Sequence, residues 1–203
     1  MINSIYMRKE QLGFNLVLLG QIASGKDTQA KLLQGKYNLI PVESGKYFRE
    51  LSKANSKDGE LLRKTVGVGK PAPVAIMKKF LIEELKKREV GKDLIFIGNP
   101  RLKPEAQLLK KLSTHYKENF FALYITLPDK EIYSRSSRGD RSDDDNKIKI
   151  KKRIKWHKDQ VSKTVKYFES LKKLKKIKGN QSVEKVSQDI EKALEYFKKL
   201  NNN

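Results

Sequence analysis

The residues best suited to chemistry in this chain form a glycine-bounded loop. Gly20 ends a short apolar run, four residues separate it from Gly25, and Lys26 and Thr28 follow. A strand that leads into such a loop and then into a helix is the context of a phosphate-binding loop. Its backbone N–H groups and the helix N-terminus form a partly positive cradle for phosphate oxygens, to which the lysine adds a point charge. An ordinary strand–turn–helix corner is the alternative, and the flanking pattern favours phosphate binding.

The arginines form a second group of candidate phosphate ligands. Nine of the 45 basic residues are arginine, so lysine carries the general positive charge. A planar guanidinium can bind phosphate through two parallel hydrogen bonds, which a lysine cannot do. Arg135, Arg138 and Arg141 fall within seven residues, a spacing that surface charge alone rarely produces. These arginines predict an anionic ligand.

Composition narrows the possible functions. The net charge of +21 suggests a nucleic-acid partner, although a lysine-rich compositional bias explains it equally well. The chain has no cysteine, which excludes disulfides and thiol catalysis, and its two histidines, His115 and His157, are too far apart to suggest a zinc site. No run approaches the roughly 20 apolar residues of a membrane span. The first thirteen residues lack the apolar core of a signal peptide, so we expect a cytoplasmic protein.

Short apolar segments alternate with helical ones along the whole chain. Strands are expected at residues 14–20, 39–42, 94–97, 120–126 and 174–177. Helices are expected at 25–36, from 44, at 60–66, 71–90, 104–112, from 128, beyond 145 and at 182–200. This alternation predicts an α/β fold with a five-stranded parallel sheet covered by helices on both faces. Such sheets bind ligands beyond the carboxyl ends of their strands.

In order and spacing, these motifs resemble those of adenylate kinase and the wider nucleoside monophosphate kinase family. The family's G-x-P-G-x-G-K-G-T-Q loop is similar to residues 20–29, and its Ser/Thr-Gly-Asp-x-x-Arg segment to residues 44–49. Its G-K-x-x-P and D-G-F-P-R-x-x-x-Q segments resemble residues 69–73 and 97–105. Its arginine-rich lid resembles residues 135–145, and the likeness as a whole runs from about Phe14 to Leu200.

The resemblance implies a P-loop NTPase fold with a small NMP-binding insertion and a short lid. It divides the chain into an extension (1–13), one kinase domain (14–200, with the NMP-binding part at about 44–73 and the lid at about 138–145) and a tail (201–203). The implied reaction is reversible transfer of the terminal phosphoryl group of ATP, with Mg²⁺, to a nucleoside monophosphate, with AMP as the first expectation. The implied protein is a monomer that binds nucleotides and no membrane; a nucleic-acid partner is not favoured.

The resemblance also implies roles for individual residues. Donor nucleotide binding falls to Gly20, Ser24, Gly25, Lys26, Asp27, Thr28 and Arg135. Acceptor binding falls to Ser44, Gly45, Arg49, Ala72, Gly98, Arg101 and Glu105. The residues expected to act on the transferring phosphoryl group are Lys26, Arg101, Arg138, Arg141 and Arg153. No protein side chain is expected to ligate a metal directly.

The chain departs from the family pattern at the expected metal site. Ile97 stands where the family has an aspartate that orders magnesium through water, and Lys46 stands where it has a second aspartate. Asp93 lies at the other end of its strand and cannot substitute. Asp27, which replaces a glycine beside the loop lysine, is the nearby carboxylate that could supply part of the missing charge, and residues 143–145 could approach from the lid.

The acceptor base and the activity itself leave alternatives open. The family has a glutamine where this chain has Glu105, and an ionised carboxylate only accepts hydrogen bonds, which suits the N–H donors of guanine. GMP or another monophosphate is therefore an alternative to AMP. A degenerate nucleotide-binding sensor and an RNA-associated protein of the same fold are further alternatives. Trp156 is expected in the core or as a half-buried anchor and His157 on the surface, while Arg63 and Arg88 are expected to face solvent.

Overall fold

Strand β1 (Asn15–Gly20) lies at the centre of a parallel sheet and leads directly into the glycine-bounded loop. The computed structural model describes residues 9–68, 71–136 and 147–201, and within them the sheet has five strands in the order β2-β3-β1-β4-β5. The other strands are β2 (Leu39–Val42), β3 (Asp93–Ile97), β4 (Phe120–Thr126) and β5 (Leu174–Lys178). Leu18 pairs with Ile97 of β3 and with Leu123 of β4, which aligns the carboxyl ends of the three central strands. The predicted five-stranded parallel sheet is confirmed.

The helices follow the strands as the alternating pattern predicts. They are α1 (Lys26–Lys36), α2 (Ser44–Lys53), α3 (Lys57–Lys64), α4 (Val74–Lys86), α5 (Lys103–His115), α6 (Asp129–Ser136), α7 (Lys147–Trp156), α8 (Ser162–Ser170) and α9 (Val183–Asn201). A 3₁₀ turn, η1 (Val66–Val68), follows α3, and a π-helical turn, η2 (His157–Val161), joins α7 to α8. No helix in the described part of the chain has the length and apolar character needed to cross a bilayer.

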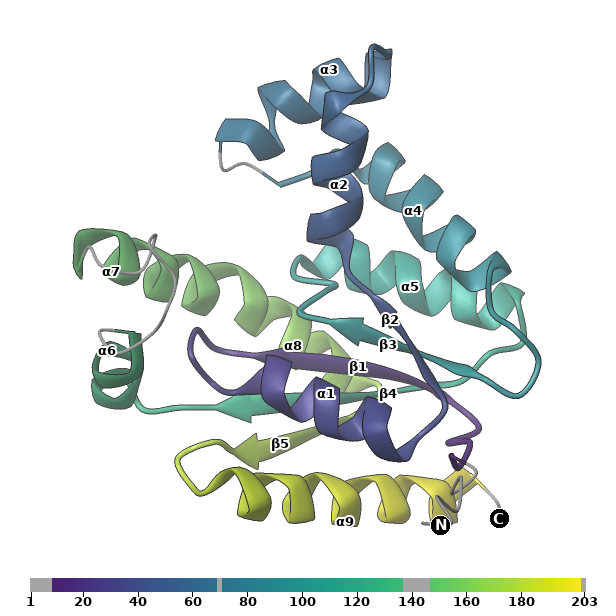
Figure 1. Cartoon of the computed structure of the whole chain (residues 1–203), viewed down its shortest axis with the longest axis vertical. Coiled ribbons are helices and arrows are strands. Elements are labelled where there is room, and N and C mark those ends of the chain that lie inside the picture. The colour runs from purple at the N-terminus through teal and green to yellow at the C-terminus, as the bar shows by residue number, and fades with distance from the viewer. Residues whose placement is uncertain (1–8, 69–70, 137–146, 202–203) are drawn as a thin grey trace, which may run out of the picture.

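Two apolar layers hold the sheet between its helices. Successive side chains of a strand point to opposite faces. Accordingly Leu16 and Leu18 of β1 pack with α1 and α9, whereas Val17 and Leu19 pack with α4, α5 and α8. All four are fully buried, which explains why β1 reads as a continuous apolar run. Figure 1 shows α1 and α9 on one side of the sheet and α4 and α5 on the other.

Two groups of helices extend beyond the sheet. Helices α2 and α3 pack on each other and stand away from the strands, at the top of Figure 1. Helices α6 and α7 share a small apolar cluster, and Ile22 of the glycine-bounded loop packs against it. The position of α7 is therefore coupled to the loop that follows β1.

The helical boundaries differ from expectation in several places; the helix expected at 60–66 is α3 (Lys57–Lys64), and the one expected at 104–112 is α5 (Lys103–His115). The helix expected over residues 71–90 spans only Val74–Lys86, and it starts late because Pro73 disfavours helical geometry in Ala72, the residue before it. The long basic helix expected beyond residue 145 contains the π-helical turn η2. Such turns are rare and often occur at functional sites, and neither the apolar stripe nor the residue propensities of this stretch indicate one.

Candidate active site

The loop between β1 and α1 has a backbone that requires glycine at two positions. A Cβ atom on Gly20 would lie 2.3 Å from the Ser24 hydroxyl oxygen. Gly25 has a φ of +81° and forms the N-cap of α1, a left-handed conformation that side chains disfavour. The Ser24 hydroxyl is buried inside the loop and has no hydrogen-bond partner among the described residues. A ligand oxygen entering the loop would satisfy it, because buried polar groups are normally hydrogen-bonded.

Lys26 begins α1 and lies across the end of β3. Its Nζ is 2.9 Å from both carboxylate oxygens of Asp27. Its aliphatic part covers Gly98, the residue after β3, where a Cβ atom would lie 3.1 Å from the Lys26 Cε. Gly98 has a φ of +67°, so both its conformation and its neighbour favour glycine. The loop lysine and the end of β3 thus meet at one point.

A cavity of about 440 Å³ opens at this point. It is lined by Leu19, Gly20, Gln21, Ile22, Lys26, Gly98, Arg101, Lys152, Arg153, Trp156, His157 and Val161. Four of these described lining residues are lysine or arginine and none is acidic. A concave site with this charge attracts and binds polyanions.

Arg101 is anchored in the cavity by contacts from two directions. Its Nε donates a hydrogen bond of 2.7 Å to the Gly98 carbonyl, and its own carbonyl accepts one of 2.9 Å from the Thr164 hydroxyl on α8. Burial lowers the pKa of Arg101, as does the charge of Arg153, while Glu105 and Asp27 oppose the shift. The guanidinium is therefore held in a partly desolvated, cation-rich environment, where an anionic ligand would be stabilised strongly.

Glu105 forms the N-terminal cap of its own helix. Its Oε2 accepts hydrogen bonds from the backbone N–H groups of Arg101, at 2.8 Å, and Leu102, at 3.1 Å. The side chain is buried, and this burial raises the pKa of the carboxyl group. Glu105 is not among the described residues that line the cavity. Its expected contact with the acceptor base stays a prediction, and any such contact has to coexist with the cap.

The other expected ligands that the structure describes are not among the residues that line the cavity. Gly45 and Arg49 are exposed neighbours on α2, since a Cβ atom on the glycine would lie 3.4 Å from the Arg49 Nη1. Arg135 donates to Glu131 at 2.7 Å and to the Gly179 carbonyl at 3.2 Å, which places it between α6 and the turn before α9. The remaining expected ligands outside the lining are Ser44 at the start of α2, half-buried Ala72, and exposed Asp27 and Thr28 on α1. Arg138 and Arg141 lie outside the described residues.

His157 is not the surface residue that the sequence suggested. Its Nε2 lies 3.0 Å from the Tyr124 hydroxyl, and the two rings stack at an interplanar angle of 14°. Burial and the nearby charge of Arg101 lower the pKa of His157 to about 4. The one signal that could have found it is its spacing, because residues four apart share a helix face and His157 follows Arg153 by four.

Three further sequence expectations need comment. Trp156 is exposed and lines the cavity, so it belongs neither to the core nor to a half-buried anchor. Arg88 is half-buried and forms an ion pair with Glu118, instead of facing solvent. Arg63 is exposed as expected, although it also donates to backbone carbonyls at the end of α2.

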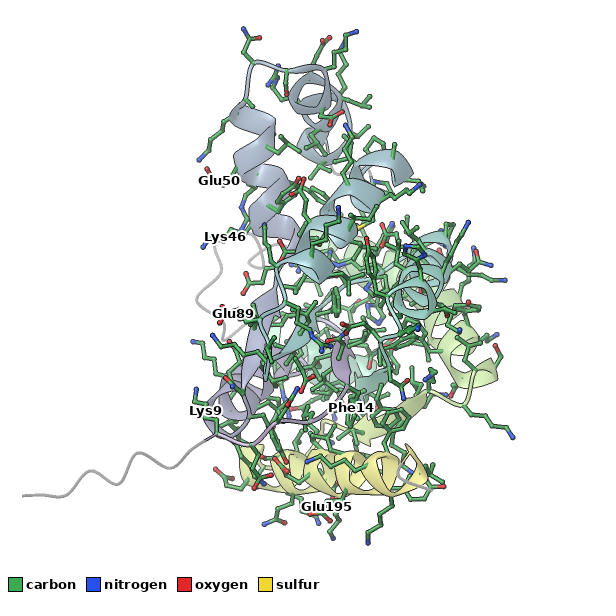
Figure 2. All side chains as sticks on the ribbon, turned by 90° about the vertical axis from the view of Figure 1, so that its right-hand side faces the viewer. Lys9, Phe14, Lys46, Glu50, Glu89 and Glu195 are labelled. Atoms are coloured by element: carbon green, nitrogen blue, oxygen red, sulfur yellow. The ribbon has the colours of Figure 1, made fainter. Side chains whose placement is uncertain are left out.

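The candidate metal site depends on Asp27. Ile97 is half-buried and packs on the apolar layer beneath α1 and α9, and Lys46 projects from α2 into solvent (Figure 2). Asp93 is buried at the opposite end of β3, where it accepts hydrogen bonds from two backbone N–H groups. No group of three or more His, Asp or Glu able to hold a metal occurs among the described residues. Magnesium held mainly by substrate phosphates needs only one or two carboxylates, and Asp27 can supply one.

Comparisons with known proteins point in the same direction. The family model described as Adenylate kinase matches residues 18–173. The chain is 28% identical over 211 residues to the protein named Adenylate kinase of Francisella tularensis subsp. novicida, an alignment that covers 86% of this chain and 96% of that protein. It is 27% identical over 181 residues to the Adenylate kinase of Flavobacterium johnsoniae, with 87% and 95% covered.

Proposed function

This chain belongs to the adenylate kinase family of nucleoside monophosphate kinases, and we propose that it transfers the terminal phosphoryl group of ATP to AMP, reversibly and as a monomer. Membership of this family supports phosphoryl transfer between nucleotides, and members of the family in general use ATP and Mg²⁺. The choice of AMP is supported by the name that the relatives carry.

One observation carries the proposal: Lys26, Arg101 and Arg153 line the same cavity although they come from three distant parts of the chain. Transfer of a phosphoryl group requires the two nucleotides to be aligned and their negative charge to be neutralised, and it requires little covalent chemistry from the protein. Fixed cations in a partly desolvated cavity supply this neutralisation without having to reorganise during the reaction.

The geometry supports a division of roles. Lys26 and the N–H groups of the glycine-bounded loop would hold the donor phosphates. Arg101, anchored to Gly98, would hold the acceptor phosphate, and Arg153 would contact the group in transfer. Arg135, next to the turn at Gly179, would lie over the donor base. When magnesium is bound, it neutralises phosphate charge and helps to align the two nucleotides.

The two extending groups of helices fit the parts of a kinase domain. Helices α2 and α3 lie within the proposed NMP-binding part at about 44–73, which carries Ser44, Gly45, Arg49 and Ala72. The proposed lid, at about 138–145, connects α6 to α7 and lies outside the described residues. Closure of such a segment over the cavity would exclude water, which otherwise competes for the phosphoryl group.

Two alternatives keep specific support. A nucleotide-binding protein with little turnover is favoured by Ile97, because an apolar side chain cannot order magnesium. An RNA-associated protein is favoured by the net charge of +21. A coupled assay with ATP, AMP and Mg²⁺ separates an enzyme from the first, and an RNA mobility shift measured across salt concentrations tests the second.

A pair of variants on one helix gives the sharper test. Lys26→Ala removes the cation at the phosphates, and we expect turnover to fall at least about 100-fold. Lys36→Ala removes a lysine from the other end of α1 that also forms a 2.9 Å ion pair, with Glu191, far from the cavity. We expect this control to keep its turnover. Undiminished turnover in Lys26→Ala would contradict the proposal.

A further inference from the structure

Asp27 follows the loop lysine, at a position where the adenylate kinase family has glycine and the general P-loop has a residue that contacts the metal. In the general G-x-x-x-x-G-K-[ST] loop, the residue after the lysine is Ser or Thr, whose hydroxyl binds Mg²⁺. Here the glycines are Gly20 and Gly25, the lysine is Lys26, and Asp27 stands in the hydroxyl position. A carboxylate is a stronger magnesium ligand than a hydroxyl, but it also repels the phosphates that the loop binds.

Among the described residues that line the cavity next to Asp27, none offers a carboxylate to a metal. The described lining of the cavity contains four cations and no acidic residue. The side chain of Asp27 is 54% exposed, so it is accessible to a ligand, and both of its oxygens lie 2.9 Å from the Lys26 Nζ. In the same loop, the buried Ser24 hydroxyl lacks a partner among the described residues, an independent sign that the loop is built to receive polar atoms.

We propose that Asp27 holds the magnesium ion of the bound nucleotide, and that this contact replaces its ion pair with Lys26. This inference rests on the proposed function. When a magnesium nucleotide binds, the ammonium group turns to the phosphates and the carboxylate to the metal. Asp27 then supplies part of the negative charge that the family's two carboxylates provide and that Ile97 and Lys46 cannot supply.

The proposal predicts that Asp27 strengthens nucleotide binding when a divalent cation is present and weakens it when the cation is absent. With a divalent cation present, the carboxylate attracts it and strengthens binding of the metal–nucleotide complex. Without the cation, the carboxylate lies beside phosphates of the same charge and weakens nucleotide binding. A purely structural role, in which Asp27 only positions Lys26, would instead strengthen nucleotide binding in both cases.

Mn²⁺ as a paramagnetic substitute for Mg²⁺ allows both cases to be measured. Free Mn²⁺ is counted by electron paramagnetic resonance in titrations of the protein with ADP, and calorimetry in EDTA gives the affinity for metal-free ADP. We expect Asp27→Asn to weaken Mn²⁺ binding in the ADP complex by at least about tenfold. We expect the same variant to bind metal-free ADP about threefold to tenfold more tightly. Asp27→Glu, which keeps the carboxylate, should recover much of the Mn²⁺ affinity.

Asp159→Asn is the matched control. Its carboxylate lies 2.9 Å from the Lys155 Nζ and its side chain is 50% exposed, so the ion pair resembles that of Asp27, but the residue belongs to η2 and not to the glycine-bounded loop. We expect this control to change neither affinity. Thermal unfolding of each variant, followed by circular dichroism, checks that the fold is kept.

Several outcomes would overturn the assignment. Unchanged Mn²⁺ affinity in Asp27→Asn would remove Asp27 from the metal site. Weaker binding of both ADP forms would show that it acts only through Lys26. If the unmodified protein binds ADP and Asp27→Asn has the same affinities for ADP and Mn²⁺, only the assignment of Asp27 to the metal fails. If the unmodified protein binds no ADP with or without Mn²⁺, the proposed function fails as well.

Discussion

The hydroxyl of Tyr124 lies 3.0 Å from the Nε2 of His157, and the two rings stack with their centroids 5.8 Å apart. Tyr124 belongs to β4 and His157 to the π-helical turn, so the contact joins the sheet to the helix that walls the cavity. Burial raises the pKa of Tyr124 to about 12, which keeps its proton in place. The lowered pKa of His157 keeps the imidazole neutral at pH 7 beside Arg101.

This pair makes folding stability depend on pH. The pKa of His157 is about 4 in the folded protein and about 6.5 in the unfolded chain, so between these values the unfolded chain binds more protons. Stability is therefore complete above pH 6.5 and decreases as the pH falls toward 4. We expect the free energy of unfolding, measured with urea, to fall between pH 7 and pH 4.5 by about 1–3 kcal/mol more in the unmodified protein than in His157→Gln.

The second histidine provides the control for this measurement. His115→Gln removes the only other histidine of the chain, at the end of α5, and should leave the pH dependence of the unmodified protein intact. If the free energy of unfolding falls by the same amount between pH 7 and pH 4.5 in the unmodified protein and in His157→Gln, the fold does not hold the imidazole neutral.

Alanine variants of Gly98 and Gly91 distinguish the effect of backbone strain from the effect of displacing Lys26. Both have φ near +70° to +80°, so alanine at either position should cost about 1–2 kcal/mol of stability. A Cβ atom on Gly98 would also lie 3.1 Å from the Lys26 Cε, whereas one on Gly91 would meet nothing within 4 Å. We expect Gly98→Ala to lose at least about tenfold in turnover by displacing the lysine, and Gly91→Ala to keep it. Equal turnover in the two variants, measured with their melting temperatures, would contradict a role for this contact.

Substitution of Glu105 tests which acceptor base the protein prefers. Replacing it with glutamine provides an amide that both donates and accepts, which matches the adenine edge. We expect Glu105→Gln to raise the ratio of kcat/KM for AMP to that for GMP by about tenfold, measured beside CMP, UMP and dTMP. Because the carboxylate also caps α5, the same change should cost about 0.5–2 kcal/mol of stability. A stability loss with an unchanged base preference would restrict Glu105 to its capping role.

Alanine variants of two neighbouring aromatic residues on α9 test how this helix packs on the sheet. Phe197 is 4% exposed and stacks on Phe121 at 4.2 Å between ring centroids, with Phe14 at 4.8 Å on its edge. Tyr196 is 62% exposed. We expect Phe197→Ala to lower the free energy of unfolding by about 3–5 kcal/mol and Tyr196→Ala by less than about 0.5 kcal/mol. Similar losses in both variants, measured by urea unfolding, would contradict this packing.

Much of the fold could be predicted because its signals are local. The strands of a parallel sheet are buried on both faces, so β1, β3 and β4 appear as continuous apolar runs. The glycine-bounded loop was predictable for the same reason, since its spacing from Gly20 to Lys26 encodes its own backbone geometry. Even β5 could be predicted, from residues 174–177 with their two lysines, and it lies at the edge of the sheet, where strands tolerate charge.

By itself, the sequence determined the order of the strands and helices along the chain and the glycine-bounded loop between β1 and α1, because each depends on residues near one another in the chain. Only the tertiary structure decided that Arg101, Arg153 and Lys26 share a cavity, that His157 stacks on Tyr124, and that Glu105 caps its helix. Burial and side-chain partners depend on which distant segments pack together. The parallel sheet brings the carboxyl ends of its strands to one edge, and it is there that residues more than 100 positions apart acquire a common environment.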